Sequence, residues 1–166
     1  MTFSLIFMFA ATQSHSETPI KNSPSMQHVM GEQVGGAEQN KKEGEQFMQT
    51  NQQEKGVVTL PSGLQYKILE PGSGPKPKVR DRVQVHYEGK LLNGTVFDSS
   101  YKRNEPLTIP VSGVIAGWQE ALQLMNTGAV WMLYIPPNLA YGEQGAGGVI
   151  GPNETLVFKV HLISIQ

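Results

Sequence analysis

The chain has 166 residues, enough for one domain of ordinary size with an appendage. Its formal net charge is -1, with no long run of either sign, and it contains no cysteine. This balance argues against nucleic-acid and anionic-lipid partners, and neutral partners such as polypeptides fit it better. The absence of cysteine excludes disulfides, thiolate nucleophiles and cysteine zinc sites.

An apolar run extends from Met1 to Ala11 and is followed by small and polar residues. It has the length of a signal-peptide core, although no Lys or Arg precedes it. It is too short for a membrane-spanning helix, which needs ~20 residues. We therefore expect residues 1–16 to be a signal-like segment and the protein to be periplasmic or secreted, with a cytoplasmic location as the alternative.

Residues 17–56 are rich in Glu, Gln, Asn, Lys, Met and Gly, and Phe47 is their only aromatic residue. Such a stretch cannot build a core of its own. Good helix formers fill 37–43 and 45–55, while each glycine among them costs ~1 kcal/mol relative to alanine. The pattern predicts a frayed, solvated helical arm that ends near Gly56. It has no heptad seam of apolar residues, so a monomer is favoured over a dimer.

Apolar residues alternate with polar ones after Gly56, which is typical of half-buried antiparallel strands. The alternation is clear in three stretches, around Leu64–Ile68, Val83–Tyr87 and Leu156–Leu162. Asn93-Gly94 predicts a tight hairpin turn in which both central residues take positive φ.

Helical spacing replaces alternation between Gly113 and Gly128, where it predicts one short amphipathic helix. Its apolar residues are Val114, Ile115, Trp118, Leu122 and Met125. A long glycine-rich loop follows at 137–154, and such loops are usually functional or disordered. Residues 57–166 are thus expected to form an α+β domain, in which a curled antiparallel sheet wraps around one short helix.

The usual signatures of hydrolytic and metal chemistry are missing from the sequence. Its four histidines have no metal-ligand spacing, and it has no Gly-x-Ser-x-Gly elbow. Gly145–Gly148 lacks the lysine of a phosphate loop. His86 and Glu88 are expected on a solvated strand face. We expect neither a metal nor a cofactor.

Five short motifs stand out in the domain, at Val85–Gly89, Gly94–Ser100, Val114–Trp118, Leu139–Gly142 and Thr155–Phe158. In this order they resemble the motifs of the FKBP-type peptidyl-prolyl cis/trans isomerases. The resemblance covers Gly56 to Gln166. Residues 60–67, 118–122 and 150–156 are most similar to the macrophage infectivity potentiator subfamily of Gram-negative bacteria.

The resemblance implies a five- to six-stranded antiparallel sheet around one helix, with a substrate pocket between them. It implies catalytic roles for Asp98, Tyr141, Tyr87, Phe97, Trp118 and Phe158, and substrate binding by Val114, Ile115, Leu107 and Ile150. Two positions depart from the family pattern. Leu107 stands where many relatives have an aromatic residue, and Ala146 stands where human relatives have histidine.

The aromatic residues of this set could also be ordinary core anchors, because each buries a large apolar area. Asp98 argues against that interpretation. An acid beside core aromatics is costly unless it has partners or a task.

The activity that the resemblance implies is rotation of X-Pro bonds in polypeptides, as a protein-folding helper. The implied ligands are proline-containing polypeptides and inhibitors of the tacrolimus or rapamycin type, with no nucleic acid and no stable membrane span. The alternative is a non-catalytic chaperone or polypeptide-binding module on the same fold.

Overall fold

The computed structural model describes residues 24–166, with side chains of the first helix described from residue 36 onward. The predicted signal-like segment, residues 1–16, lies outside the described residues. The elements are α1 Pro24–Asn51, β1 Val57–Thr59, β2 Gln65–Glu70, β3 Arg82–Leu91, β4 Val96–Ser99, α2 Ser100–Arg103, β5 Leu107–Pro110, η2 Val111–Gly113, α3 Ala116–Leu124, β6 Val130–Ile135, η3 Pro137–Leu139 and β7 Leu156–Ile165.

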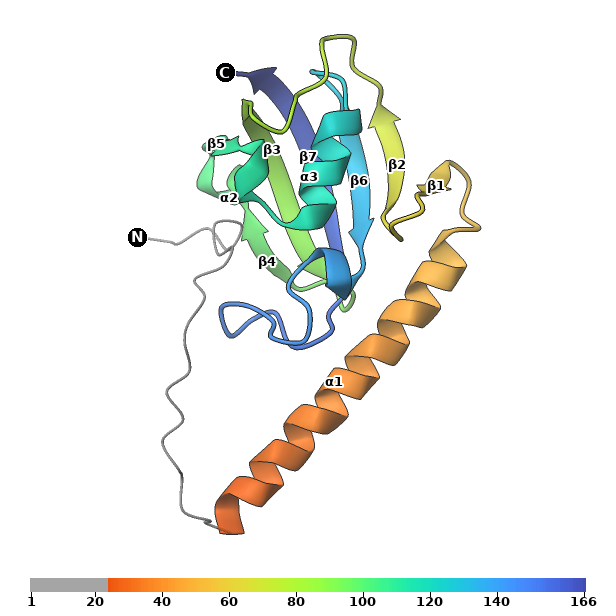
Figure 1. The fold of residues 1–166 in the computed structure, drawn as a ribbon, viewed down its shortest axis with the longest axis vertical. Coiled ribbons are helices and arrows are strands. Elements are labelled where there is room, and N and C mark those ends of the chain that lie inside the picture. Colours follow the sequence, from red (N-terminus) through yellow and green to blue (C-terminus); the bar gives the residue numbers. More distant parts are fainter. Residues whose placement is uncertain (1–23) are drawn as a thin grey trace.

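Within residues 24–166 the strands form one antiparallel sheet in the order β1-β2-β6-β7-β3-β4, and β5 pairs with β3. The sheet has seven strands rather than five or six. Figure 1 shows α3 lying across one face of the curled sheet, with the core between them. The predicted α+β fold, a curled sheet around a short helix, is therefore confirmed.

Helix α3 starts two residues later than the apolar spacing predicts. Val114 is extended and Ile115 is the N-cap residue, and Trp118, Ala121 and Leu122 form the buried face of the helix. Gly117 lets the helix approach the sheet closely, because a Cβ at this position would lie 2.7 Å from Ile135 Cγ2.

The hairpin between β3 and β4 forms at the predicted place but with a different turn. Gly94 has a φ of 88°, whereas Asn93 does not take a positive φ. The loop is closed by hydrogen bonds from Gly94 N–H to Leu91 O (3.0 Å) and from Leu91 N–H to Thr95 O (2.9 Å). Three residues therefore lie in the loop, with glycine in the left-handed position. Asn93 accepts a hydrogen bond from Thr95 N–H on its side-chain oxygen.

Helix α1 is one continuous helix, and the prediction that the arm is solvated is wrong for its C-terminal half. Gly44 and Asn51 are buried against the domain. Asn51 Nδ2 donates to Gln65 Oε1 at 2.8 Å, and Gln65 Nε2 donates to the Met48 carbonyl at 2.9 Å. In Figure 1 the other end of α1 projects away from the sheet. None of the helices within residues 24–166 is long and apolar enough to cross a membrane.

Candidate functional site

Four aromatic rings from four elements meet between the sheet and α3. Trp118 contacts Tyr87 and Phe158 edge to face, with centroid distances of 5.3 Å for both pairs. Phe97 stands edge-on to Phe158 at 5.5 Å. Tyr87, Trp118 and Phe158 are fully buried and Phe97 is half-buried. Edge-to-face pairs of this kind fix the ring positions in addition to burying apolar area.

The missing side chain of Gly89 makes this packing possible. Gly89 lies on β3 and pairs with Phe158 on β7 on one side and with Asp98 on β4 on the other. A Cβ here would lie 2.6 Å from Phe158 Cε1 and 2.6 Å from Phe97 Cζ. The glycine that ends the first motif therefore leaves room for two aromatic rings.

Asp98 is 9% exposed and lies beside the rings with a partner for each carboxylate oxygen. Tyr87 donates its hydroxyl to Asp98 Oδ2 at 2.7 Å, and Arg103 Nη1 donates to Asp98 Oδ1. Arg103 Nη2 also donates to the Tyr87 hydroxyl at 2.7 Å. The partners offset the cost of burying the carboxylate, so its burial alone does not show a catalytic role.

Arg103 is the member of this network that sequence reasoning missed. The short helix α2 places it, starting at Ser99, whose Oγ accepts a hydrogen bond from Lys102 N–H. Burial lowers the pKa of Arg103, but hydrogen bonds to Asp98 and Tyr87 outweigh this and hold the pKa above its ordinary value. The sequence offers one indication of this partner, because an acid that is expected to be buried requires a cation nearby.

Ser100 holds the backbone of Tyr87 where β4 ends. Its hydroxyl accepts a hydrogen bond from Tyr87 N–H at 2.7 Å and lies 3.2 Å from the Tyr87 carbonyl. His86 Nδ1 is 2.8 Å from the same hydroxyl, and its ring stacks on Tyr101. His86 is thus half-buried and bonded, not simply a solvated residue as expected.

Tyr141 is half-buried on the loop after η3. Burial raises the pKa of its hydroxyl well above the ordinary tyrosine value, and the charges of Asp98 and Tyr87 act in the same direction. The hydroxyl therefore keeps its proton and can donate a hydrogen bond. Its electrostatic coupling to both residues links it to the Asp98 network.

The predicted substrate-binding residues all lie in or against the same apolar core. Val114, Ile115 and Ile150 are buried, whereas Leu107 on β5 is half-buried. The half-buried members of the whole set are Leu107, Phe97 and Tyr141. Among residues 24–166 the Ile115 N–H has no hydrogen-bond acceptor.

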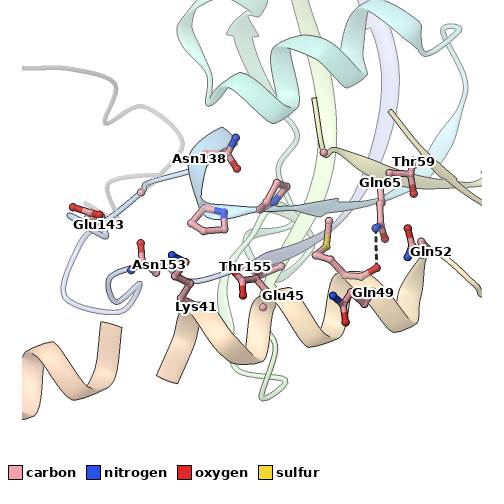
Figure 2. A pocket seen from close by; sticks show the side chains of 16 residues that line it. Lys41, Glu45, Gln49, Gln52, Thr59, Gln65, Asn138, Glu143, Asn153 and Thr155 are labelled. Atoms are coloured by element: carbon pink, nitrogen blue, oxygen red, sulfur yellow. Dashed lines mark hydrogen bonds between the residues drawn. The ribbon is translucent and has the colours of Figure 1, made fainter. Parts of the chain in front are cut away.

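A cavity of about 650 Å³ lies elsewhere, between α1 and the domain (Figure 2). Polar side chains of α1 form one wall, including Lys41, Glu45 and Gln49, and the other wall includes Pro137 and Asn138. None of the predicted site residues lines it. In the described part of the chain no group of three or more His, Asp or Glu side chains is placed to hold a metal ion.

Comparison with known proteins agrees with this geometry. Residues 74–163 match the family described as "FKBP-type peptidyl-prolyl cis-trans isomerase", and residues 9–68 match the "Domain amino terminal to FKBP-type peptidyl-prolyl isomerase". The chain belongs to the FKBP-type peptidyl-prolyl cis-trans isomerase family, as the five motifs predict.

Individual relatives point to the predicted subfamily. The chain is 61% identical over 120 residues to "Peptidyl-prolyl cis-trans isomerase Mip" of Coxiella burnetii, which covers 72% of this chain and 52% of that protein. It is 55% identical over 130 residues to "Outer membrane protein MIP" of Legionella longbeachae, covering 78% of this chain and 56% of that protein.

A solved structure supports the fold directly. The crystal structure of FkpA from Escherichia coli superposes with a TM-score of 0.81 at 40% identity, covering 85% of this chain and 66% of that one. The chain spans about half the length of the first curated relatives that it matches.

Proposed function

We propose that the protein catalyses cis/trans isomerisation of X-Pro bonds in polypeptides, with the aromatic cluster as its proline site. The observation that carries the proposal is the meeting of Tyr87, Phe97, Trp118 and Phe158 beside a buried, hydrogen-bonded carboxylate. Membership of the isomerase family supports the same activity.

Rotation of an X-Pro bond needs a suitable environment rather than a nucleophile. Its barrier of ~18–20 kcal/mol comes from amide resonance, which is lost in the twisted amide. The twisted amide is less polar than the planar one, so a dry aromatic site favours it over the ground state. The edge-to-face rings supply such a site, in which Trp118 is the floor and Tyr87, Phe97 and Phe158 are the walls.

The polar groups at the site orient the substrate chain. The Tyr141 hydroxyl, which stays protonated, donates to one substrate carbonyl, and the Ile115 N–H donates to another. Asp98 acts as a fixed dipole whose direction is set by Tyr87 and Arg103, and it transfers no proton.

Val114, Leu107 and Ile150 are proposed to favour an apolar residue before proline, and their place in or against the same apolar core supports this. The same site binds inhibitors of the tacrolimus or rapamycin type, and one ring of the inhibitor packs over Trp118. Leu107 offers less contact area than an aromatic residue, so we expect weaker inhibitor binding than in relatives that have one.

The experiment that tests the activity is proline-limited refolding of a second protein. An isomerase at substoichiometric concentration accelerates the slow phase, which otherwise takes ~10–100 s. A non-catalytic chaperone changes the phase only in proportion to its own amount. Acceleration that needs stoichiometric protein would contradict the proposed activity.

The organisation of the chain is part of the proposal. We take residues 1–16 as an export signal, 17–56 as the helical arm and 57–166 as the isomerase domain of a monomer in the periplasm or outside the cell. The apolar run at the start and the similarity to the "Outer membrane protein MIP" of Legionella longbeachae support export. Terminal sequencing and sedimentation of the mature protein test these assignments, and an intact Met1 or a tight dimer would contradict them.

A further inference from the structure

Two asparagine side chains fasten the glycine-rich loop, residues 137–154, to helix α1. Asn153 Nδ2 donates to the carbonyl of Ala37 at 3.3 Å. Asn40 Nδ2 donates in the opposite direction, to the carbonyl of Pro152 at 3.0 Å. Both bonds are partly buried and join residues more than a hundred positions apart. We call this pair of bonds the asparagine clip.

The clip continues directly to the part of the loop that carries Tyr141. Asn153 N–H donates to the carbonyl of Gly142 at 2.8 Å, and Gly142 N–H donates to Pro137 O at 2.9 Å. A path of hydrogen bonds therefore runs from α1 through Asn153 to the residue that follows Tyr141.

The other side of the loop is held by a backbone bridge within the loop itself. Ala146 and Ile150 exchange both backbone hydrogen bonds, at 2.8 and 3.0 Å. Pro152, which accepts from Asn40, is two residues beyond Ile150, one of the buried core residues proposed for substrate binding. The clip thus bears on both loop residues that the site uses.

Apart from the Ala146–Ile150 bridge, the glycine-rich sequence of the loop restricts its backbone little, so support from α1 matters. Gly142, Gly145 and Gly148 all have positive φ, and glycine has the widest conformational freedom of any residue. A hydrogen-bond donor must stay within a few tenths of an ångström of its place to act on a reacting group, so loop drift reduces the rate.

We propose that helix α1 is a positioning element of the isomerase site, which it reaches through Asn40 and Asn153. It holds the loop so that Tyr141 and Ile150 stay at the rim of the aromatic cluster. This inference rests on the proposed isomerase function and deepens it, since it assigns a role in that reaction to a helix outside the site.

Two substitutions remove the clip without disturbing the local backbone. Asn153→Gly keeps the left-handed conformation, since the φ of Asn153 is 57°, but removes the donor. Asn40→Ala removes the other donor and favours the helix, because alanine has the higher helix propensity. Lys42→Ala is the matched control, as it truncates an exposed side chain on the same helix.

The experiment uses the full chain and two readouts. The first is kcat/KM with a short proline peptide, at a temperature where circular dichroism shows each variant fully folded. The second is the ¹⁹F resonance of Tyr141 in fluorotyrosine-labelled protein, assigned by its loss in Tyr141→Phe. We expect each clip variant to lower kcat/KM by about threefold or more, as for loss of one hydrogen bond, and to move or broaden the Tyr141 line. Lys42→Ala should change neither readout.

Folded clip variants that keep the wild-type kcat/KM would overturn the proposal, and so would a loss of activity without a change in the Tyr141 line. The proposed function would stand in both cases, since the wild type remains active. An inactive wild type would instead remove the proposed function, and an unmoved Tyr141 line in the clip variants would then overturn the positioning role as well. If Asn153→Gly does not fold, the two readouts of Asn40→Ala alone test the positioning role.

Discussion

Both carboxylate oxygens of Asp98 are hydrogen-bonded inside the apolar site. Tyr87 donates to one oxygen and Arg103 to the other. Arg103 also donates to the Tyr87 hydroxyl, so the three side chains form a closed network. Removing one member therefore takes one hydrogen bond from each of the other two.

Replacing Asp98 by alanine should therefore reduce both activity and stability. We expect kcat/KM to fall about tenfold or more, equivalent to at least ~1.4 kcal/mol of transition-state stabilisation. From the sequence alone we expect unchanged or slightly higher stability. The structure reverses that expectation to a loss of about 1–3 kcal/mol, because Tyr87 and Arg103 each lose their hydrogen bond to the carboxylate.

Urea unfolding and peptide isomerisation of Asp98→Ala and Asp98→Asn separate the two effects. Asparagine keeps an acceptor for Tyr87 but loses the charge that pairs with Arg103. A folded Asp98→Ala protein with full activity would show that the carboxylate is structural only.

Tyr141 gives a prediction about pH. Its pKa lies above the ordinary tyrosine value of about 10, so its hydroxyl remains a donor as the pH rises towards 10. We expect kcat/KM to show no loss from Tyr141 ionisation between about pH 7 and 9.5. Tyr141→Phe should lower kcat/KM by about threefold or more at every pH, as one hydrogen bond is lost. A decline centred below pH 10 that is absent from Tyr141→Phe would contradict this assignment.

The apolar periodicity of the sequence is enough to predict the elements, because it depends only on which side chains are buried. Strands β3 and β7 and helix α3 all follow from it. It also places Tyr87, Phe158 and Trp118 on buried faces, although only the motif resemblance indicates that these faces meet in one site.

Polar contacts could not be predicted in this way, because they depend on tertiary structure. Arg103 meets Asp98 only because α2 folds back at the end of β4. The docking of α1 depends in part on the hydrogen bond from the Asn153 side chain to the Ala37 carbonyl, and these two residues are 116 positions apart. The turn at Asn93 differs for a more local reason, since its side chain accepts from Thr95 N–H within a three-residue loop.

The contact between α1 and the glycine-rich loop contains a like-charge pair, Glu43 and Glu154, that can be tested by pH. Partial burial raises the pKa of Glu154, and the charge of Glu43 on α1 raises it further. A raised pKa means that the folded state holds the proton more tightly than the unfolded state. The stability contribution of Glu154 is therefore full below its ordinary pKa and is lost as the pH rises through the raised value.

Glu154→Gln should remove this loss of stability at higher pH. We expect its melting temperature at pH 7 to exceed that of the wild type by about 1–3 °C, and the difference to vanish near about pH 4, where Glu154 is protonated. Thermal unfolding across this pH range provides the measurement. A glutamine variant that is less stable at pH 7 would show that the Glu154 charge has a stabilising partner.

At the scale of the whole molecule, the protein is an isomerase-type domain with a long helix docked on its outside. Only the C-terminal half of α1 contacts the domain through described side chains, while its other end projects away (Figure 1). The docking combines hydrogen bonds of asparagine and glutamine side chains with a ring contact between Phe47 of α1 and Tyr134 of β6, whose centroids are 5.9 Å apart. The helix therefore contacts the domain without contributing to its main apolar core.

The central claim is that the folded protein lowers the barrier to X-Pro rotation in its aromatic site. The most direct test is exchange spectroscopy on a short proline peptide, which has no fold for a chaperone to protect. We predict that substoichiometric protein produces cis/trans exchange far faster than the uncatalysed ~10–100 s, and that saturating tacrolimus abolishes it. Exchange at the uncatalysed rate with fully folded protein would contradict the account.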